Sequence, residues 1–293
     1  MSPLMVGVIN RTKARFGGRR GPPLGQVYYD LWRLLNKGAV YSRTATWIFR
    51  AGPTVALAAL IVATLLMPLG NCPSAVQFSG DLILFVYLLA MARLSIVLAA
   101  LDVGSSFEAM GASREVLFSA LAEPALLLGI AALARDTGKL SLSAIHAELS
   151  AAAWAHAPLT LILVAVALAV VFLAENCRVP IDDPSTHLEL TMIHEVMVLD
   201  HSGPDFAFIT YAAGLKLWVL GALIVNLILP ARTGITVLDF AIALLAMFAL
   251  SVAVGIVEST IARLRMVRVP QLLVGAATLS ALALVLEYGG RTS

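Results

Sequence analysis

Charged residues are scarce in this chain. Only 13% of its 293 residues are Asp, Glu, Lys or Arg, whereas 60% are hydrophobic. A water-soluble domain of this length carries about a quarter charged residues. The shortage excludes a water-soluble globular protein and indicates a polytopic integral membrane protein.

Cysteine is also scarce, with only Cys72 and Cys177 present. Two thiolates cannot form the four-cysteine cage of an iron–sulfur cluster. We expect the two residues on opposite sides of the bilayer, which excludes a disulfide between them. The sequence therefore predicts no cofactor in this chain, and any redox centre must be supplied by another chain.

The chain has no alternating strand pattern and no internal repeat, but it has long apolar runs. A helix needs about 20 apolar residues to cross roughly 30 Å of hydrocarbon. Seven stretches meet this requirement: 52–70, 81–102, 113–134, 156–174, 206–229, 235–257 and 270–288. We therefore predict an all-α polytopic transmembrane helix bundle, with residues 1–293 forming a single membrane domain.

The first ten residues, "MSPLMVGVIN", are apolar but too short to cross the membrane. They fit a truncated or partial N-terminal span, an interfacial piece, or a start codon that was misassigned. A cleavable signal is disfavoured, because the basic cluster follows the apolar part instead of preceding it.

The positions of Lys and Arg predict the orientation. Fourteen of them flank one set of helix ends and four flank the other, while Arg93 and Lys216 fall inside spans. The basic side is expected to face the cytoplasm, with loops at 11–50, 103–112, 175–205 and 258–269. We expect the cell membrane of a bacterium or an archaeon.

The first loop contains "RTKARFGGRRGPPLGQVYYDLWRLLNKG". Its basic residues, among them Arg15, Arg19 and Arg20, can hold the orientation and contact anionic lipid headgroups or a docked partner. Apolar residues recur at helical spacing over 26–36, which predicts an amphipathic helix at the membrane interface. Because the basicity is local and adjoins a span, we expect no nucleic-acid binding.

The third loop, residues 174–203, concentrates ionisable groups. It holds three histidines and six carboxylates: Glu175, Asp182, Asp183, Glu189, Glu195 and Asp200. Pro180 and Pro184 end the preceding helix, and "THLE" fits a capping box that starts a new one. We predict a short amphipathic helix over 186–199, with one packed face and one solvated face that carries His187, His194 and His201.

These histidines do not form a metal site by spacing. Each is seven residues from the next, about 10.5 Å along a helix, so one ion cannot bridge them. The loop fits either a proton-exchanging or docking surface or a plain solvated loop. Its candidate coupling residues are Glu175, Arg178, Asp182, Asp183, Glu189 and Glu195.

Several ionisable residues fall within the spans, where each is costly and needs a reason. Arg93, Glu123 and Lys216 lie at matched depth, about 13–15 Å from the basic side at 1.5 Å per residue. Two cations and one carboxylate at matched depth indicate a mutually neutralising cluster that faces the bundle interior. Glu115 and Glu175 are expected nearer the cytoplasmic mouth and Asp239 nearer the outer face. Glu123 can pair with a cation merely to hold two helices together, or it can belong to a chain of protonatable groups that leads into the bilayer.

A family resemblance rests on residues spread over the whole chain. Ala174-Glu175, Arg178, Pro180, Asp182, Pro184, Glu189-Leu190 and Ser202-Gly203 resemble the signature loop of respiratory complex I subunit 1. "ARFGGRRGPPLGQ" is similar to that family's first cytoplasmic loop, and "ESTIARLRMVRVPQLL" to its last. The form "DDPSTHLELTMIHEVMVLDHSG" is closer to the membrane subunits of group 4 [NiFe] hydrogenases, such as formate hydrogenlyase and hydrogenase-4.

The resemblance implies a non-catalytic subunit of an oxidoreductase complex. Such a subunit docks the peripheral hydrogenase large and small subunits, which carry Fe–S clusters and the Ni–Fe centre. It passes the effect of electron transfer to antiporter-like, proton-pumping membrane subunits. The family has eight spans, the first of which is reduced here to residues 1–10.

Two alternatives stay open. The first is the quinone-channel subunit of an NADH:quinone oxidoreductase. Ser185 and His187 stand where that family carries acidic residues, which argues against a quinone site. The second is a free-standing ion transporter, which predicts an inverted repeat that the sequence does not show. The electron donor and acceptor, and the choice of proton or sodium as the coupling ion, do not follow from the sequence.

Overall fold

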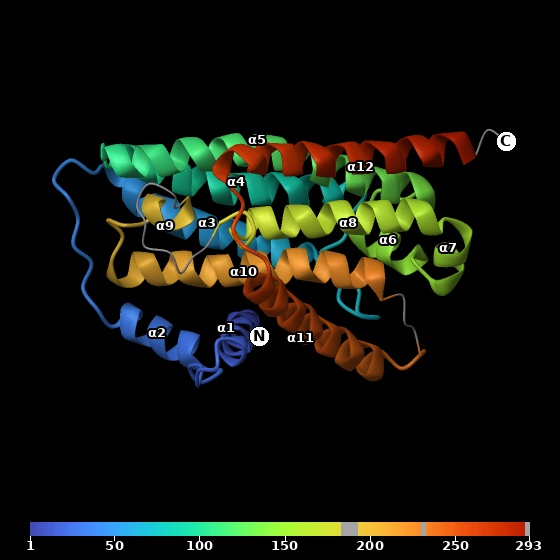
Figure 1. Ribbon diagram of the computed structural model, residues 1–293, viewed down its shortest axis with the longest axis horizontal. Coiled ribbons are helices and arrows are strands. Elements are labelled where there is room, and N and C mark those ends of the chain that lie inside the picture. Colours follow the sequence, from blue (N-terminus) through green and yellow to red (C-terminus); the bar gives the residue numbers. More distant parts are fainter. Residues whose placement is uncertain (183–192, 230–232, 291–293) are drawn as a thin grey trace.

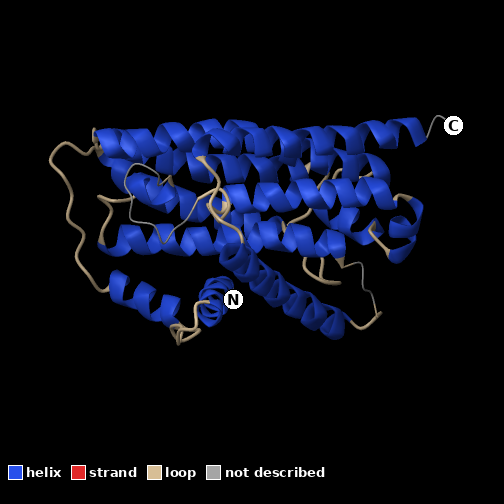
Figure 2. Cartoon of the chain, in the orientation of Figure 1, coloured by secondary structure: helices blue, strands red, loops and turns tan. Residues whose placement is uncertain are grey.

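The computed structural model describes residues 1–182, 193–229 and 233–290. All regular elements in these ranges are helices, most of them long and side by side along one axis (Figures 1 and 2). In chain order they are α1 (Ser2–Phe16), α2 (Gln26–Leu35), α3 (Trp47–Leu66), α4 (Asp81–Asp102), α5 (Ser106–Thr137), α6 (Leu142–Glu148), α7 (Ala151–His156), α8 (Pro158–Glu175), α9 (His194–Met197), α10 (Gly203–Ile228), α11 (Thr236–Thr260), the 3₁₀ turn η1 (Met266–Arg268) and α12 (Val269–Gly290).

Seven segments are long and apolar enough to cross a membrane, and they match the seven predicted spans. They are α3, α4, α5, α8, α10, α11 and the segment Met266–Tyr288 that contains α12. The predicted all-α membrane bundle is therefore confirmed. Of these helices α10 is the most buried, with 67% of its apolar window inside the protein. It forms the centre against which α1, α2, α3 and α8 pack.

The helix ends are fixed by specific hydrogen bonds. Asp102 closes the junction between α3 and α4, because its carboxylate accepts from Thr46 N at 2.6 Å and from Thr46 Oγ1 at 2.7 Å. The Thr46 hydroxyl in turn accepts from Ile48 N, as an N-cap of α3 does. Gly203 begins α10 with φ of +57°, and a Cβ there would lie 2.8 Å from the Gly38 carbonyl oxygen. A side chain at position 203 would therefore push the first loop away.

One predicted loop is shorter than expected. Residues 106–112, predicted to lie in a loop, belong to α5, which has 32 residues and begins at Ser106. The hydropathy run marks only the apolar part of this helix. The polar turns around Glu108, Arg114 and Glu115 continue it, because Glu, Arg, Ala and Met all favour helix.

The N-terminal residues form a packed helix. α1 contacts α10 and α11, with Met5 and Ile9 fully buried, and Figure 1 shows it nearly end-on, across the direction of the long helices. Its contact with α11 is close, because a Cβ on Gly255 would lie 2.7 Å from Thr12 Cβ. α1 is a crossing helix in this bundle, not an upright span.

The two predicted amphipathic helices have different outcomes. The first is confirmed as α2, whose Leu31 is buried while Tyr29 and Trp32 are exposed. Of the second, predicted over 186–199, only the four-residue α9 is described, and residues 183–192 lie outside the described ranges.

Candidate functional site

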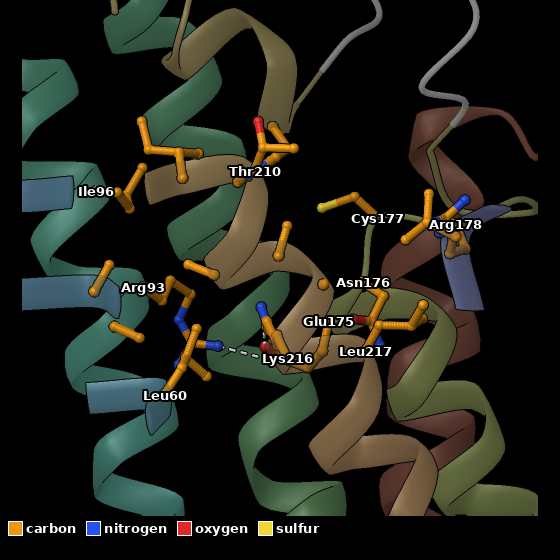
Figure 3. Close-up of a pocket in the computed structure, with 18 of the residues that line it drawn as sticks. Leu60, Arg93, Ile96, Glu175, Asn176, Cys177, Arg178, Thr210, Lys216 and Leu217 are labelled. Carbon is orange, nitrogen blue, oxygen red and sulfur yellow. Dashed lines mark hydrogen bonds and ion pairs between the residues drawn. The ribbon is translucent and has the colours of Figure 1, made fainter. Parts of the chain in front are cut away.

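Four charged side chains from four helices meet inside the bundle. Glu175, the last residue of α8, lies between Arg93 of α4 and Lys216 of α10 (Figure 3). Its Oε1 is 2.6 Å from Arg93 Nη1 and its Oε2 is 2.7 Å from Lys216 Nζ. The other guanidinium nitrogen of Arg93, Nη2, pairs with Oε1 of Glu123 on α5. We call Arg93, Glu123, Glu175 and Lys216 the central charge cluster.

Burial explains why these charges pair. The Glu175 side chain is only 5% exposed, and those of Arg93 and Lys216 are also largely covered. An uncompensated charge in such a site costs several kcal/mol, roughly, so each must have a partner of opposite sign. Glu175 satisfies two cations at once and thereby joins α4, α8 and α10.

The structure changes one expected position. The sequence placed Glu175 near the cytoplasmic mouth and expected Arg93, Glu123 and Lys216 to neutralise one another. Arg93 does pair with Glu123, but Lys216 pairs with Glu175. Counting residues along a span gives the depth of a side chain but not the direction in which it points. In addition, the C-terminal end of α8 lies further inside the bundle than the N-terminal ends of α5 and α10 (Figure 1).

A cavity of about 260 Å³ adjoins the cluster. Its lining comes from α1, α2, α3, α4, α5, α8, α9, α10 and the loop after α8, and Figure 3 shows Arg93, Glu175 and Lys216 close together on it. The polar and charged lining residues are Asp30, Arg93, Glu115, Glu175, Asn176, Cys177, Arg178, His194, Thr210 and Lys216. The cavity thus places residues of the third loop and of the spans around one space.

Glu115 and Cys177 form a second buried pair beside the cluster. Glu115 is buried and Cys177 is half-buried, and the Cys177 thiol points at Glu115 Oε2 across 3.9 Å. Burial raises the pKa of the Cys177 thiol well above its usual range, so the sulfur keeps its proton and acts as a weak donor. A protonated, enclosed thiol is not a reactive nucleophile.

Asp182 fastens the third loop to the last one. Its Oδ1 lies 3.0 Å from Arg263 Nη2, and its Oδ2 accepts a hydrogen bond from Ile193 N at 3.1 Å. Leu264 N also donates to the Pro180 carbonyl at 2.9 Å. One carboxylate therefore joins the loop after α8 to Ile193 and to Arg263 of the last loop.

Two other coupling candidates, Asp183 and Glu189, lie outside the described residues. Glu195 is described: it lies half-buried in α9.

Glu258, which the sequence analysis did not single out, pairs with two cations. Its side chain is 0% exposed and lies 2.9 Å from Lys13 Nζ and 3.3 Å from Arg178 Nη1. It thereby ties the end of α11 to α1 and to the loop after α8. The signal was an acidic residue among the basic ones of "ESTIARLRMVRVPQLL", where a lone carboxylate needs a partner.

The histidines do not share one solvated face, contrary to the prediction. His194 lines the cavity, whereas His201 is buried and stacks on Phe49 with ring centroids 3.9 Å apart. Burial lowers the pKa of His194 to about 4 and that of His201 to about 4, so both rings are neutral at pH 7. His187 lies outside the described residues.

The remaining predicted residues lie apart from the cavity. Asp239, in the first turn of α11, accepts from Thr233 N at 2.8 Å and from Thr233 Oγ1 at 2.7 Å, which stabilises the turn that starts the helix. Arg15, Arg19 and Arg20 are exposed around the end of α1. Within the described part of the chain, no group of three or more His, Cys, Asp or Glu side chains could hold a metal ion.

Two known membrane-complex subunits are similar to this chain over nearly its whole length. The chain is 31% identical to hydrogenase-4 component C of Escherichia coli, over 99% of its own length and 92% of that protein. It is also 31% identical to formate hydrogenlyase subunit 4 of E. coli, over 93% of its length and 89% of that protein.

Among solved structures, a chain of the membrane-bound sulfane sulfur reductase, an archaeal respiratory membrane complex, has the same fold. The TM-score is 0.84 with 22% sequence identity, and the match covers 98% of this chain and 94% of that one. The sequence model of the family described as NADH dehydrogenase matches residues 1–288. The chain therefore belongs to the NADH dehydrogenase family, whose members resemble respiratory complex I subunit 1.

Proposed function

We propose that this chain is the membrane subunit of a complex I-like hydrogenase, where it anchors the peripheral redox module and couples electron transfer to proton translocation. The main support for this proposal is the central charge cluster, which lies beside a cavity that ionisable residues of the third loop also line. The names of the two curated relatives support the hydrogenase assignment. Membership of the family itself supports a complex I-like membrane subunit.

The anchoring role falls to the basic end of the bundle, the end where α3, α5 and α10 begin. There Tyr29 and Trp32 of α2 are exposed, next to the exposed basic segment with Arg15, Arg19 and Arg20. Exposed aromatic and basic side chains together fit the headgroup layer of a membrane and the acidic rim of a docked protein. We place the peripheral hydrogenase large and small subunits, with their Fe–S and Ni–Fe centres, over this end, on the cytoplasmic side.

The coupling role falls to the carboxylates around the cavity. Glu115 and Glu175 line it, and Glu123 is connected to them through Arg93, which pairs with both Glu123 and Glu175. In a site of low polarity such an arrangement holds its protons according to the net charge nearby. A unit charge on the order of 15 Å away, at an effective dielectric constant of about 20, changes the energy of one ionised group by about 1 kcal/mol. That is about a sixfold change in the proton-binding equilibrium of the group.

The third loop supplies the connection between the two roles. Asp182 and Glu258 bind Arg263, Arg178 and Lys13, so the loop, α1 and α11 form one charged layer at the basic end. An electron that arrives in a module docked on this layer would change the electrostatic potential at Glu175, which lines the same cavity as Arg178 of this layer. Protons would then pass to antiporter-like membrane subunits.

Replacement of Glu175 tests the proposal. In the intact complex in membranes of its own host, Glu175→Gln should lower the number of protons moved per electron by at least fivefold, because the amide cannot ionise. Dye quenching in inverted vesicles measures the protons, and hydrogen turnover measures the electrons. Glu175→Asp should restore part of the coupling.

Glu148→Gln is the matched control, since Glu148 is an exposed residue at the end of α6, away from the cavity. Copurification of the other subunits must be equal in the three variants, so that lost coupling is not lost assembly. Normal proton-to-electron ratios in an assembled Glu175→Gln complex would contradict the coupling role.

The cavity itself favours one second candidate, the quinone-channel subunit of an NADH:quinone oxidoreductase. A largely apolar space of about 260 Å³ that ends in a few charged groups suits an aromatic headgroup. Under this alternative, added short-chain quinone restores electron flow in lipid-depleted membranes, and a photoreactive quinone labels cavity residues such as Thr210. If added quinone does not change the rate of electron flow, the quinone-channel alternative is excluded.

A further inference from the structure

Glu123 differs from the other members of the central charge cluster, because its side chain opens to the outside of the bundle. It is 38% exposed, whereas its partner Arg93 is nearly covered. Arg93 lies nine residues from the end of α4 at Asp102, about 13.5 Å at the helical rise. The exposed part of the carboxylate is therefore at the depth of the lipid tails.

A groove of about 590 Å³ surrounds this carboxylate on the face formed by α4 and α5. Apart from Arg93 and Ser119 its wall is mostly apolar and includes Tyr87, 69% exposed, and Met91, while the small residues Ala90 and Ala120 leave room for another backbone to approach. The full lining is Leu84, Tyr87, Leu88, Ala90, Met91, Arg93, Leu94, Val97, Val116, Ser119, Ala120 and Glu123. Arg93 lines both this groove and the inner cavity.

One oxygen of the exposed carboxylate has no donor among the described residues. Glu123 accepts from Arg93 through Oε1, and no described residue donates a hydrogen bond to its Oε2. An ionised oxygen in hydrocarbon needs a hydrogen-bond donor. Lipid tails offer no donor. A two-fold contact of this groove with a second copy of this chain would bring two Glu123 carboxylates into one interface, because such a contact pairs the same surface with itself.

We propose that the groove between α4 and α5 is the docking site of a transmembrane helix from a second membrane subunit, and that this helix places a hydrogen-bond-donating side chain opposite Glu123. The inference rests on the proposed function and names the face through which coupling leaves this subunit. Arg93 is the link, since it contacts Glu175 on the cavity side and Glu123 on the groove side.

Crosslinking in the native complex tests the docking. A photoreactive amino acid at Met91 should form an adduct that peptide mapping assigns to a membrane-spanning segment of another subunit. That segment should carry a Lys, Arg, His, hydroxyl or carboxyl side chain near the crosslinked position. Adducts with lipid alone, or with a second copy of this chain, would overturn the proposal.

Filling the groove is the second test. Ala120→Trp places a large ring on an exposed position of the groove floor and should reduce recovery of the crosslinked subunit at least fivefold. Leu117→Trp is the matched control, since Leu117 is exposed on the same helix and does not line the groove. Equal recovery in both variants would contradict the inference.

Two replacements of Glu123 separate docking from coupling. Glu123→Gln keeps an oxygen acceptor and should retain the partner subunit while lowering proton translocation. Glu123→Leu removes the acceptor and should lower both. If the Glu123→Leu complex keeps both the partner subunit and the crosslinked adduct, the docking proposal is wrong. If the Glu123→Gln complex keeps the partner and pumps protons normally, only the relay role of Glu123 is wrong.

Discussion

Two sets of carboxylates in the bundle have different kinds of partners. At the end opposite the basic loops, Asp81 accepts hydrogen bonds from Ser141 Oγ at 2.6 Å and Leu142 N at 2.7 Å, and Asp239 accepts from Thr233. These partners are neutral groups at helix starts. Toward the basic end and in the bundle centre, Asp182, Glu175 and Glu258 pair instead with cations from distant parts of the chain.

This contrast distinguishes structural carboxylates from candidate coupling groups. A carboxylate held by fixed backbone and hydroxyl donors serves the local turn, and a charge arriving elsewhere leaves its partners in place. A carboxylate between two cationic side chains, such as Glu175 between Arg93 and Lys216, can lose one partner or gain a proton when the nearby charge changes. The predictions below test that difference, from the largest effect to the smallest.

Removing Arg93 should cause the largest loss of stability. Arg93→Leu leaves Glu123 without its cation and Glu175 with only Lys216, and breaking a buried pair in this way costs about 3–5 kcal/mol. We expect a lower midpoint of thermal unfolding in detergent and a lower yield in membranes. Arg93→Lys, which keeps one charge, should recover part of the loss. A Leu variant as stable as the wild type would show that the pairs contribute nothing net.

Replacing Glu258 by Gln should have a smaller effect. The amide keeps the shape and one acceptor but loses the charge that holds Arg178 and the partly exposed Lys13. Hydrogen bonds to charged groups contribute about 1.5–3 kcal/mol each, and the solvent near Lys13 reduces its share. The thermal midpoint measures the loss. If Lys13→Met and Glu258→Gln show additive effects, the two residues do not interact.

Asp239→Asn should cost less again, because asparagine can still accept from Thr233. The expected loss is about 1 kcal/mol, with no change in protons moved per electron. Asp81→Asn serves as its companion at the same end. A coupling defect in Asp239→Asn would erase the distinction between the two ends.

Acid should produce the smallest of these effects. The pKa of His201 is lowered to about 4 by burial, so between pH 6.5 and pH 4 the unfolded chain binds a proton that the folded protein does not. This group's contribution is nearly complete at about pH 7.5 and is lost as the pH falls, by about 0.8 kcal/mol at pH 6. His201→Phe, which keeps a ring against Phe49, should flatten this part of the pH profile of stability. A profile unchanged by the substitution would refute the assignment.

The sequence by itself determined the membrane class, the seven spans and the amphipathic α2. Each depends on local composition: a run of apolar residues long enough to cross the bilayer, or apolar residues at helical spacing. Residue counts along the spans also put Arg93, Glu123 and Lys216 at one depth, but they left Glu175 nearer the cytoplasmic mouth than the structure has it. The placement of Lys and Arg predicts the orientation.

Only the tertiary structure decided which charges meet and which way they face. Arg93, Glu123, Glu175 and Lys216 come from four helices, and their pairing depends on helix rotation and on how deep α8 ends. The ion pairs of Glu258 could not be predicted, because its two partners, Lys13 and Arg178, lie far from it in the sequence. His201, expected in solvent, is buried on Phe49 because α10 begins against the first loop. Side-chain direction between distant segments is set by packing, which no local pattern contains.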